Sequence, residues 1–194
     1  MSRHGKMIRD AAVHHVIGLL ATGLLFFSSN SLAIAQVTVN PMSLGPVKVV
    51  SGEPSYLDLG LGAFNIQEHG PSGAEAEAKI EFRYGQKLFY IGPAIGLLST
   101  QNGAVFGYVG IYSDLKYYSF TVTPLAGVGG YHRGGGEDLG NTFQFRLSLT
   151  VSHELDNRSR LGVQFAHISN AGISDINPGD NELLVSYAIP ISLP

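Results

Sequence analysis

The sequence predicts an all-β fold, an eight-stranded antiparallel transmembrane β-barrel. Charged residues make up only 14% of the chain, against ~25% in ordinary soluble domains, while glycine contributes 25 of the 194 residues. After position 36, apolar and polar residues alternate with a period of two over long stretches, as they do in strands. The connections between these stretches alternate between tight turns and mostly longer loops, which is typical of outer-membrane barrels.

The clearest strand covers residues 74–84, where charged and apolar residues alternate strictly. In a barrel the charged face would line the lumen, where opposite charges neutralise one another. That face consists of Glu75, Glu77, Lys79, Glu81 and Arg83. The strand near 142–153 repeats the pattern and turns Arg146 inward. Six further strands are expected at residues 55–66, 87–98, 104–113, 117–130, 159–169 and 183–191.

Two prolines fall inside these expected strands, Pro93 and Pro124. A proline has no N–H to donate to the hydrogen-bond ladder, so bulges or kinks are expected at both positions. The tight connections are expected at residues 85–86, 114–116 and 156–158. The first, fifth and seventh connections are longer, whereas the third, at 100–103, is itself short.

The first 35 residues have the pattern of a cleaved export signal. A basic beginning is followed by an apolar run at 16–27 and by the small-residue site Ala33-Ile34-Ala35. The run is about 12 residues long, short of the ~20 that a spanning helix needs. The expected organisation is therefore a signal at 1–35, an N-terminal segment at 36–53 without an assigned role, and a barrel at 54–194.

The seventh expected strand carries the residues of greatest chemical interest. Leu161, Val163 and Phe165 share one face, and His167 and Ser169 have the same parity, so all five are expected to face lipid. A serine and a histidine two positions apart on one face can reach each other as a nucleophile and a general base. The alternative is that the histidine is an interfacial ring and the serine a turn former at the end of the strand.

Several stretches resemble the lipid A 3-O-deacylase (PagL) family of outer-membrane acyl hydrolases. They are Leu125–Tyr131, Gly140–Arg146, Arg160–Gly172 and Asn177–Gly179. The most specific part is His167-x-Ser169-Asn170-Ala171-Gly172 at the end of the penultimate strand. The resemblance implies an eight-stranded barrel in the outer membrane of a Gram-negative-type cell. Its active site would face the outer leaflet and hydrolyse the ester at the 3 position of lipid A.

The resemblance also implies roles for individual residues. Ser169 would be the nucleophile and His167 the general base. Asn170 and the backbone N–H of Gly172 would hold the oxyanion, and a glycine permits the close approach that this requires.

The residue that orients the histidine is less directly given. The family's acid follows the Asn-Pro-Gly turn, and the position that aligns with it is Asn181, with Glu182 next in the chain. We expect Glu182 to be the orienting acid, reaching the ring through a bulge or a longer turn. Asn181 is the alternative, because amides orient the histidine in some proteases. Asp175 and Asp180 are weaker candidates.

Other signals exclude several kinds of partner. The net charge is −3 and no basic stripe occurs, which argues against nucleic acid. The histidines outside the expected site show no metal-ligand spacing, so neither a metal nor another cofactor is expected. The expected substrate is lipid A, or the lipopolysaccharide that contains it. Two other functions remain open, a non-enzymatic structural or adhesin barrel and a barrel acyltransferase.

Overall fold

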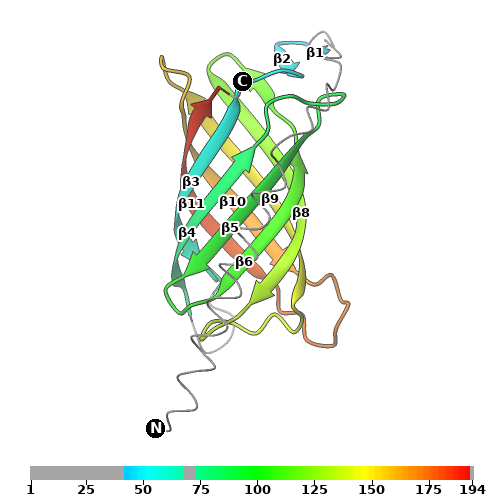
Figure 1. The fold of residues 1–194 in the computed structure, drawn as a ribbon, viewed down its shortest axis with the longest axis vertical. Helices are drawn as coiled ribbons and strands as arrows, with labels where there is room; N and C mark the ends of the chain where they lie inside the picture. Colours follow the sequence, from blue (N-terminus) through cyan, green and yellow to red (C-terminus); the bar gives the residue numbers. More distant parts are fainter. Residues whose placement is uncertain (1–41, 68–72, 193–194) are drawn as a thin grey trace, which may run out of the picture. The chain divides into compact units, whose positions relative to one another are not determined.

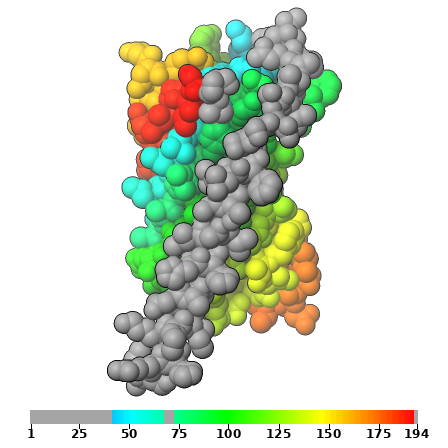
Figure 2. Space-filling model, in the orientation of Figure 1, coloured from blue at the N-terminus to red at the C-terminus, as the bar shows by residue number. Residues whose placement is uncertain are grey.

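Eight antiparallel strands close into a barrel in the computed structural model, which describes residues 42–67 and 73–192. The expected export signal at 1–35 lies outside the described residues. The barrel strands are β3 (Ser55–Phe64), β4 (Glu75–Arg83), β5 (Gly92–Thr100), β6 (Val105–Tyr112), β8 (Phe120–His132), β9 (Phe143–Glu154), β10 (Arg160–Ser169) and β11 (Asp180–Ile191). Each pairs with the next, and the pairing of β11 with β3 closes the ring (Figure 1). In the space-filling view, the red residues of β11 lie beside the cyan residues of β3 (Figure 2). The described residues contain no helix long and apolar enough to span a membrane.

The two ends of the barrel differ. We call the end with connections 65–74, 101–104, 133–142 and 170–179 the loop end. The opposite end carries two additional strands, β1 (Met42–Leu44) and β2 (Val47–Val49), and we call it the hairpin end (Figure 1). The hairpin pairs with β7 (Leu115–Tyr117), a short strand that in turn pairs with the beginning of β8.

Side chains alternate between the lumen and the outer surface along every barrel strand. On β4 the five charged residues predicted to face inward are all buried, and Arg146 of β9 is fully buried as well. On the other face of β10, Leu161, Val163 and Phe165 are each about half exposed, as lipid-facing side chains must be in an isolated barrel. The predicted fold class and the predicted charged lumen are therefore confirmed.

Ion pairs occupy the lumen together with a cluster of buried apolar residues that includes Phe64, Leu98 and Phe106. Arg146 of β9 bonds Glu182 of β11, two strands away, at 2.6 Å and also donates to Gln164 of the intervening β10 at 3.2 Å. Asp58 pairs with both Lys79 and Arg83. Buried charges are tolerated when they are paired and hydrogen-bonded, so these contacts explain how a chain with so many ionic strand positions can fold.

The strand expected at 117–130 begins only at Phe120, because the tight connection lies at 118–119 in place of 114–116. Two other predicted strand boundaries are wrong as well. The strand expected at 87–98 begins only at Gly92, because Phe89 and Tyr90 adopt positive φ angles in a tight turn between Leu88 and Ile91. The last strand begins at Asp180 instead of residue 183, because its pairing with β10 continues as far as Ile168. The shift of the last strand determines where the side chains of the candidate site point.

Neither proline breaks its own strand. Pro93 is the second residue of β5, and β8 pairs with β9 on both sides of Pro124 without a bulge. The interruption lies instead on the neighbouring strand, where Ser113 and Asp114 separate β6 from β7. The N–H of Ser113 donates to the carbonyl of Pro124, so the pairing tolerates the missing donor.

A buried ion pair fixes the turn that follows β6 at the hairpin end. The Lys87 ammonium lies 2.6 Å from the Asp114 carboxylate, and Thr123 donates to the same carboxylate at 2.5 Å. Burial opposes ionisation of Asp114, but Lys87, Arg160 and Arg83 outweigh it and lower the pKa of this carboxyl from 3.8 to about 2.

Replacing this carboxylate should reduce stability in a pH-dependent way. Because the folded-state pKa of Asp114 is depressed, its contribution is present above about pH 4 and is lost as the pH falls toward 2. We expect Asp114→Asn to lower the free energy of unfolding at pH 7 by about 2 kcal/mol, and the difference to shrink below pH 4. Urea unfolding in detergent at pH 7 and at pH 2.5 measures this difference in stability, with Asp156→Asn at an exposed position as the control. An equal loss at pH 7 and at pH 2.5 would contradict the assignment.

Candidate functional site

The candidate site lies on the outer surface of the barrel at the loop end. His167 and Ser169 occupy the same face of β10 as Leu161, Val163 and Phe165, and both are half-buried. Polar side chains on a lipid-facing surface are unfavourable unless they have a partner or a role. The predicted outward orientation of the pair is therefore what the barrel displays.

Apolar side chains border the pair on its neighbour β9. Ser169 lies opposite Phe145 in the strand register, and His167 lies opposite Leu147. Phe143 contacts Phe145 edge to face, with ring centroids 5.2 Å apart. These exposed rings and aliphatic groups form a surface on which a hydrocarbon chain can pack.

The ring of His167 is held by an amide. Its Nδ1 lies 2.9 Å from Oδ1 of Asn181, the residue directly opposite on β11. An amide oxygen only accepts hydrogen bonds, so Nδ1 must carry the proton in this contact. Nε2 is then unprotonated and can accept a proton, which is the tautomer that a general base requires.

The loop after Ser169 is organised by Asn170. Its buried side-chain nitrogen donates to the carbonyl of Leu139, to Ser174 Oγ and to the carbonyl of Ile176, at 2.7–2.8 Å. Its side-chain oxygen accepts the N–H of Gly172 at 2.9 Å. Both groups expected to hold an oxyanion are therefore already engaged in this structure, and they join the loop at 170–179 to the loop at 133–142.

One backbone donor beside Ser169 has no hydrogen-bond partner among the described residues. The N–H of Asn170 donates to Asn177 Oδ1, and that of Ile173 donates to the carbonyl of Asn170. Among residues 170–173 this leaves the N–H of Ala171 without a partner within the described parts of the chain. Ala171 has a φ of 53°, which is uncommon for a residue with a Cβ and reflects the tight turn immediately after the serine.

Comparison with known proteins identifies the family. The model of the lipid A 3-O-deacylase (PagL) family matches residues 56–190, which is most of the chain. The chain belongs to this family. The crystal structure of the outer membrane enzyme PagL is similar in fold, with a TM-score of 0.52 and 18% identity over 70% of this chain and 99% of that one.

A de novo designed transmembrane β-barrel is similar in fold as well, with a TM-score of 0.54 and 11% identity over 74% of this chain. A comparison with curated protein sequences gives no match. Family membership makes this chain an outer-membrane β-barrel, and lipid A 3-O-deacylation is the activity of the family.

The structure does not place Glu182, the residue predicted to orient His167, beside the imidazole. Glu182 is fully buried in the lumen and bonded to Arg146, on the opposite side of the barrel wall from the imidazole. Because β11 begins at Asp180, no bulge interrupts its alternation, which turns residues 180 and 182 inward and residue 181 outward. Asp175 lies exposed in the loop. Neither Asp175 nor Asp180 bonds His167 within the described residues.

No hydrogen bond joins Ser169 to His167 within residues 42–67 and 73–192, although the two side chains share a face. Catalytic contacts are often longer without substrate and shorten when it binds. The same residues contain no group of three or more His, Cys, Asp or Glu side chains placed to hold a metal ion.

Sequence reasoning missed the role of Gly179. This residue has a φ of 66°, and a Cβ added to it would lie 2.8 Å from Cε1 of His167 and 3.3 Å from Nε2. The backbone of Gly179 therefore packs against the imidazole edge that Asn181 does not contact. The Asn177-Pro178-Gly179 turn was visible in the sequence, but its contact with the ring required the closed barrel.

Gly179→Ala should displace the His167 ring, and Gly172→Ala is a matched control. Both glycines have positive φ angles, but a Cβ at residue 172 would meet nothing within 4 Å. Both variants should lose about 1 kcal/mol of stability from backbone strain. Only Gly179→Ala should also shift the imidazole ¹H–¹⁵N resonances of His167. Equal spectra for the two variants would show that the ring does not depend on this contact.

Proposed function

We propose that this protein hydrolyses the 3-O-linked acyl ester of lipid A with Ser169 as nucleophile and His167 as general base. The observation that carries the proposal is the contact between His167 Nδ1 and Asn181 Oδ1, two residues from a serine on the lipid-facing surface. A barrel without enzymatic activity has no need to fix a histidine tautomer there. Family membership supports the same reaction and substrate.

The reaction would follow the double-displacement chemistry of serine esterases. His167 Nε2 takes the hydroxyl proton as Ser169 Oγ attacks the ester carbonyl carbon, which gives a tetrahedral intermediate. The C–O bond to the sugar then breaks, and the imidazolium returns the proton to the departing 3-hydroxyl oxygen. Water attacks the acyl-enzyme in the same manner and releases the fatty acid. The reaction as written needs no cofactor.

Asn181 would orient the ring without contributing a charge. A carboxylate fixes the histidine tautomer and stabilises the imidazolium that forms during the reaction. An amide oxygen fixes the tautomer equally well, but it stabilises the imidazolium only through its dipole. We therefore expect a moderate catalytic rate, because Asn181 occupies the position that aligns with the family's acid.

The oxyanion donor that we propose is the N–H of Ala171. It lies two residues after the nucleophile and has no partner within residues 42–67 and 73–192, whereas the donors of Asn170 and Gly172 stabilise the loop. A free, fixed N–H beside the nucleophile is the kind of group that stabilises developing negative charge.

Ser169→Ala should abolish hydrolysis and leave the barrel folded. Loss of the nucleophile should lower the rate of acyl release at least ~10³-fold, because members of such a dyad act together. Mass spectrometry of lipid A incubated with the purified protein measures the released chain. Ser99→Ala is the control, since Ser99 is an exposed, outward serine near the loop end of β5. Full activity of Ser169→Ala would refute the nucleophile, and an inactive wild type would refute the function.

A second pair of variants tests the orienting residue. Asn181→Ala should lower the rate more than ~10-fold, because the ring loses the acceptor that fixes its tautomer. Glu182→Gln should leave the rate within about threefold and instead reduce stability, because it weakens the buried pair with Arg146. Rates per folded molecule and urea unfolding separate these effects. The reverse order of rates would return the orienting role to the carboxylate.

A further inference from the structure

Residues 42–53 lie outside the family match at 56–190, and the barrel closes without them. The segment nevertheless binds firmly to the hairpin end. Two of its N–H groups donate to barrel turns, Val50 to the carbonyl of Asp114 and Glu53 to the carbonyl of Gly85. In return, the carbonyl of Ser51 accepts the N–H of Lys87. The segment is thus tied to two different turns of the barrel, which suggests a role beyond that of a linker.

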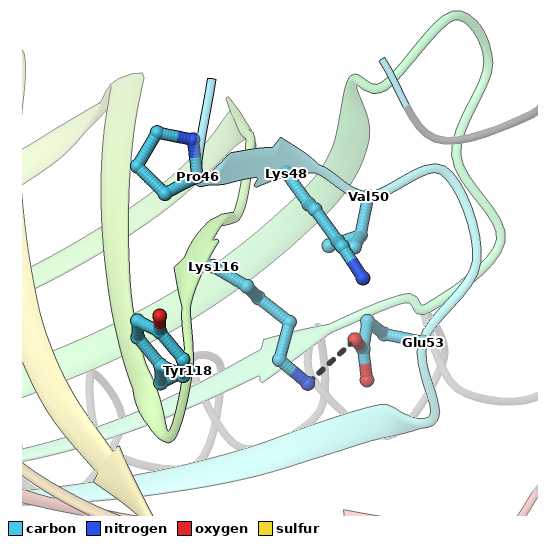
Figure 3. Close-up of a pocket in the computed structure, with 6 residues that line it drawn as sticks. All are labelled: Pro46, Lys48, Val50, Glu53, Lys116 and Tyr118. Carbon is cyan, nitrogen blue, oxygen red and sulfur yellow. Dashed lines mark hydrogen bonds and ion pairs between the residues drawn. The ribbon is translucent and has the colours of Figure 1, made fainter. Parts of the chain in front are cut away.

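A pocket of about 430 Å³ lies between this segment and β7 (Figure 3). Pro46, Lys48, Val50 and Glu53 line it from the segment 42–53, and Lys116 and Tyr118 line it from the β7 side. Glu53 is the acidic residue of this lining, and its carboxylate bonds Lys116. Lys116 donates to Glu53 at 3.0 Å and to Glu154 at 2.9 Å, which leaves one of its three ammonium hydrogens free.

Two like charges face each other across this pocket. Lys48 is directly opposite Lys116 in the pairing of β2 with β7. Like charges in that position destabilise a sheet unless something neutralises them. The carboxylates neutralise Lys116, but Lys48 has no carboxylate partner among residues 42–67 and 73–192. The register therefore creates a place for an anion between the two strands.

The surroundings of the pocket indicate where that anion comes from. Exposed apolar and aromatic side chains surround the hairpin end, which is typical of a membrane–water interface. They are Met42, Leu44, Leu88, Phe89, Tyr117 and Tyr118, and Tyr118 is 82% exposed. The hydrolysis of lipid A proposed above requires the candidate site, at the opposite end, to meet the leaflet that contains lipid A. The hairpin end is therefore at the level of the other leaflet, which is made of phospholipid.

We propose that this pocket binds the phosphate headgroup of a phospholipid from the leaflet opposite the candidate active site. Lys48 and the free hydrogen of Lys116 hold the phosphate, and Pro46, Val50 and Tyr118 pack against the glycerol backbone. The segment at 42–53 then fixes the depth of the barrel in the membrane. The choice of leaflet rests on the hydrolytic function proposed above, whereas the binding of the phosphate rests on the pocket alone.

Native mass spectrometry in a maltoside detergent tests the site. The purified protein is titrated with phosphatidylglycerol, with diacylglycerol of the same chains, and with inorganic phosphate. We expect one retained phosphatidylglycerol and no retained diacylglycerol. Lys48→Gln should weaken this binding about fivefold, the change that corresponds to ~1 kcal/mol per basic residue at an anionic surface. Arg133→Gln is the control, because Arg133 is an exposed basic residue at the loop end.

Lys48 is exposed and without an ion-pair partner among the described residues, so its replacement should not impair folding; urea unfolding verifies this. Equal retention of phosphatidylglycerol by the wild type and Lys48→Gln would overturn the proposal. Equal weakening by Arg133→Gln would reduce it to nonspecific charge attraction. Inorganic phosphate that binds as tightly as the lipid would identify the ligand as a free anion and overturn the assignment to a headgroup.

Discussion

The absence of water inside a bilayer is the constraint on which this structure depends. Every backbone N–H and C=O in the membrane must find a partner within the protein, and for strands only a closed barrel provides one. Because β11 pairs with β3 and closes the barrel, each side chain on a strand faces either the lumen or the lipid. The strict alternation of β4 follows from this, with its charges inside and its apolar residues outside.

The same constraint separates the two neighbours that competed for the orienting role. Glu182 carries a charge, and the lumen offers it Arg146 at 2.6 Å. Asn181 is neutral and can remain at the outer surface, where its amide oxygen meets His167. A carboxylate that is already neutralised by a buried arginine is not available to a histidine on the other side of the wall.

Glycines and short polar side chains give the loop end its shape. Gly179 allows the chain to pass against the imidazole, and Asn170 joins two loops through four hydrogen bonds of its side chain. These contacts occupy the groups that were expected to bind an oxyanion, and the N–H of Ala171 has no partner among the residues that the structure describes. The loop thus supports the serine by holding one turn in place, while the strand register places the histidine.

The sequence by itself determined the fold class, the charged lumen and the outward pair of His167 and Ser169, because a period of two is a local property that any window of a strand displays. It also contained the family signature. Only the tertiary structure decided where β11 begins, that Asn181 in place of Glu182 meets the histidine, and that Gly179 packs on the ring. The same holds for Lys48 opposite Lys116 in the hairpin. Each of these depends on the register between strands or on contacts between loops distant in the sequence, which alternation within one strand cannot specify.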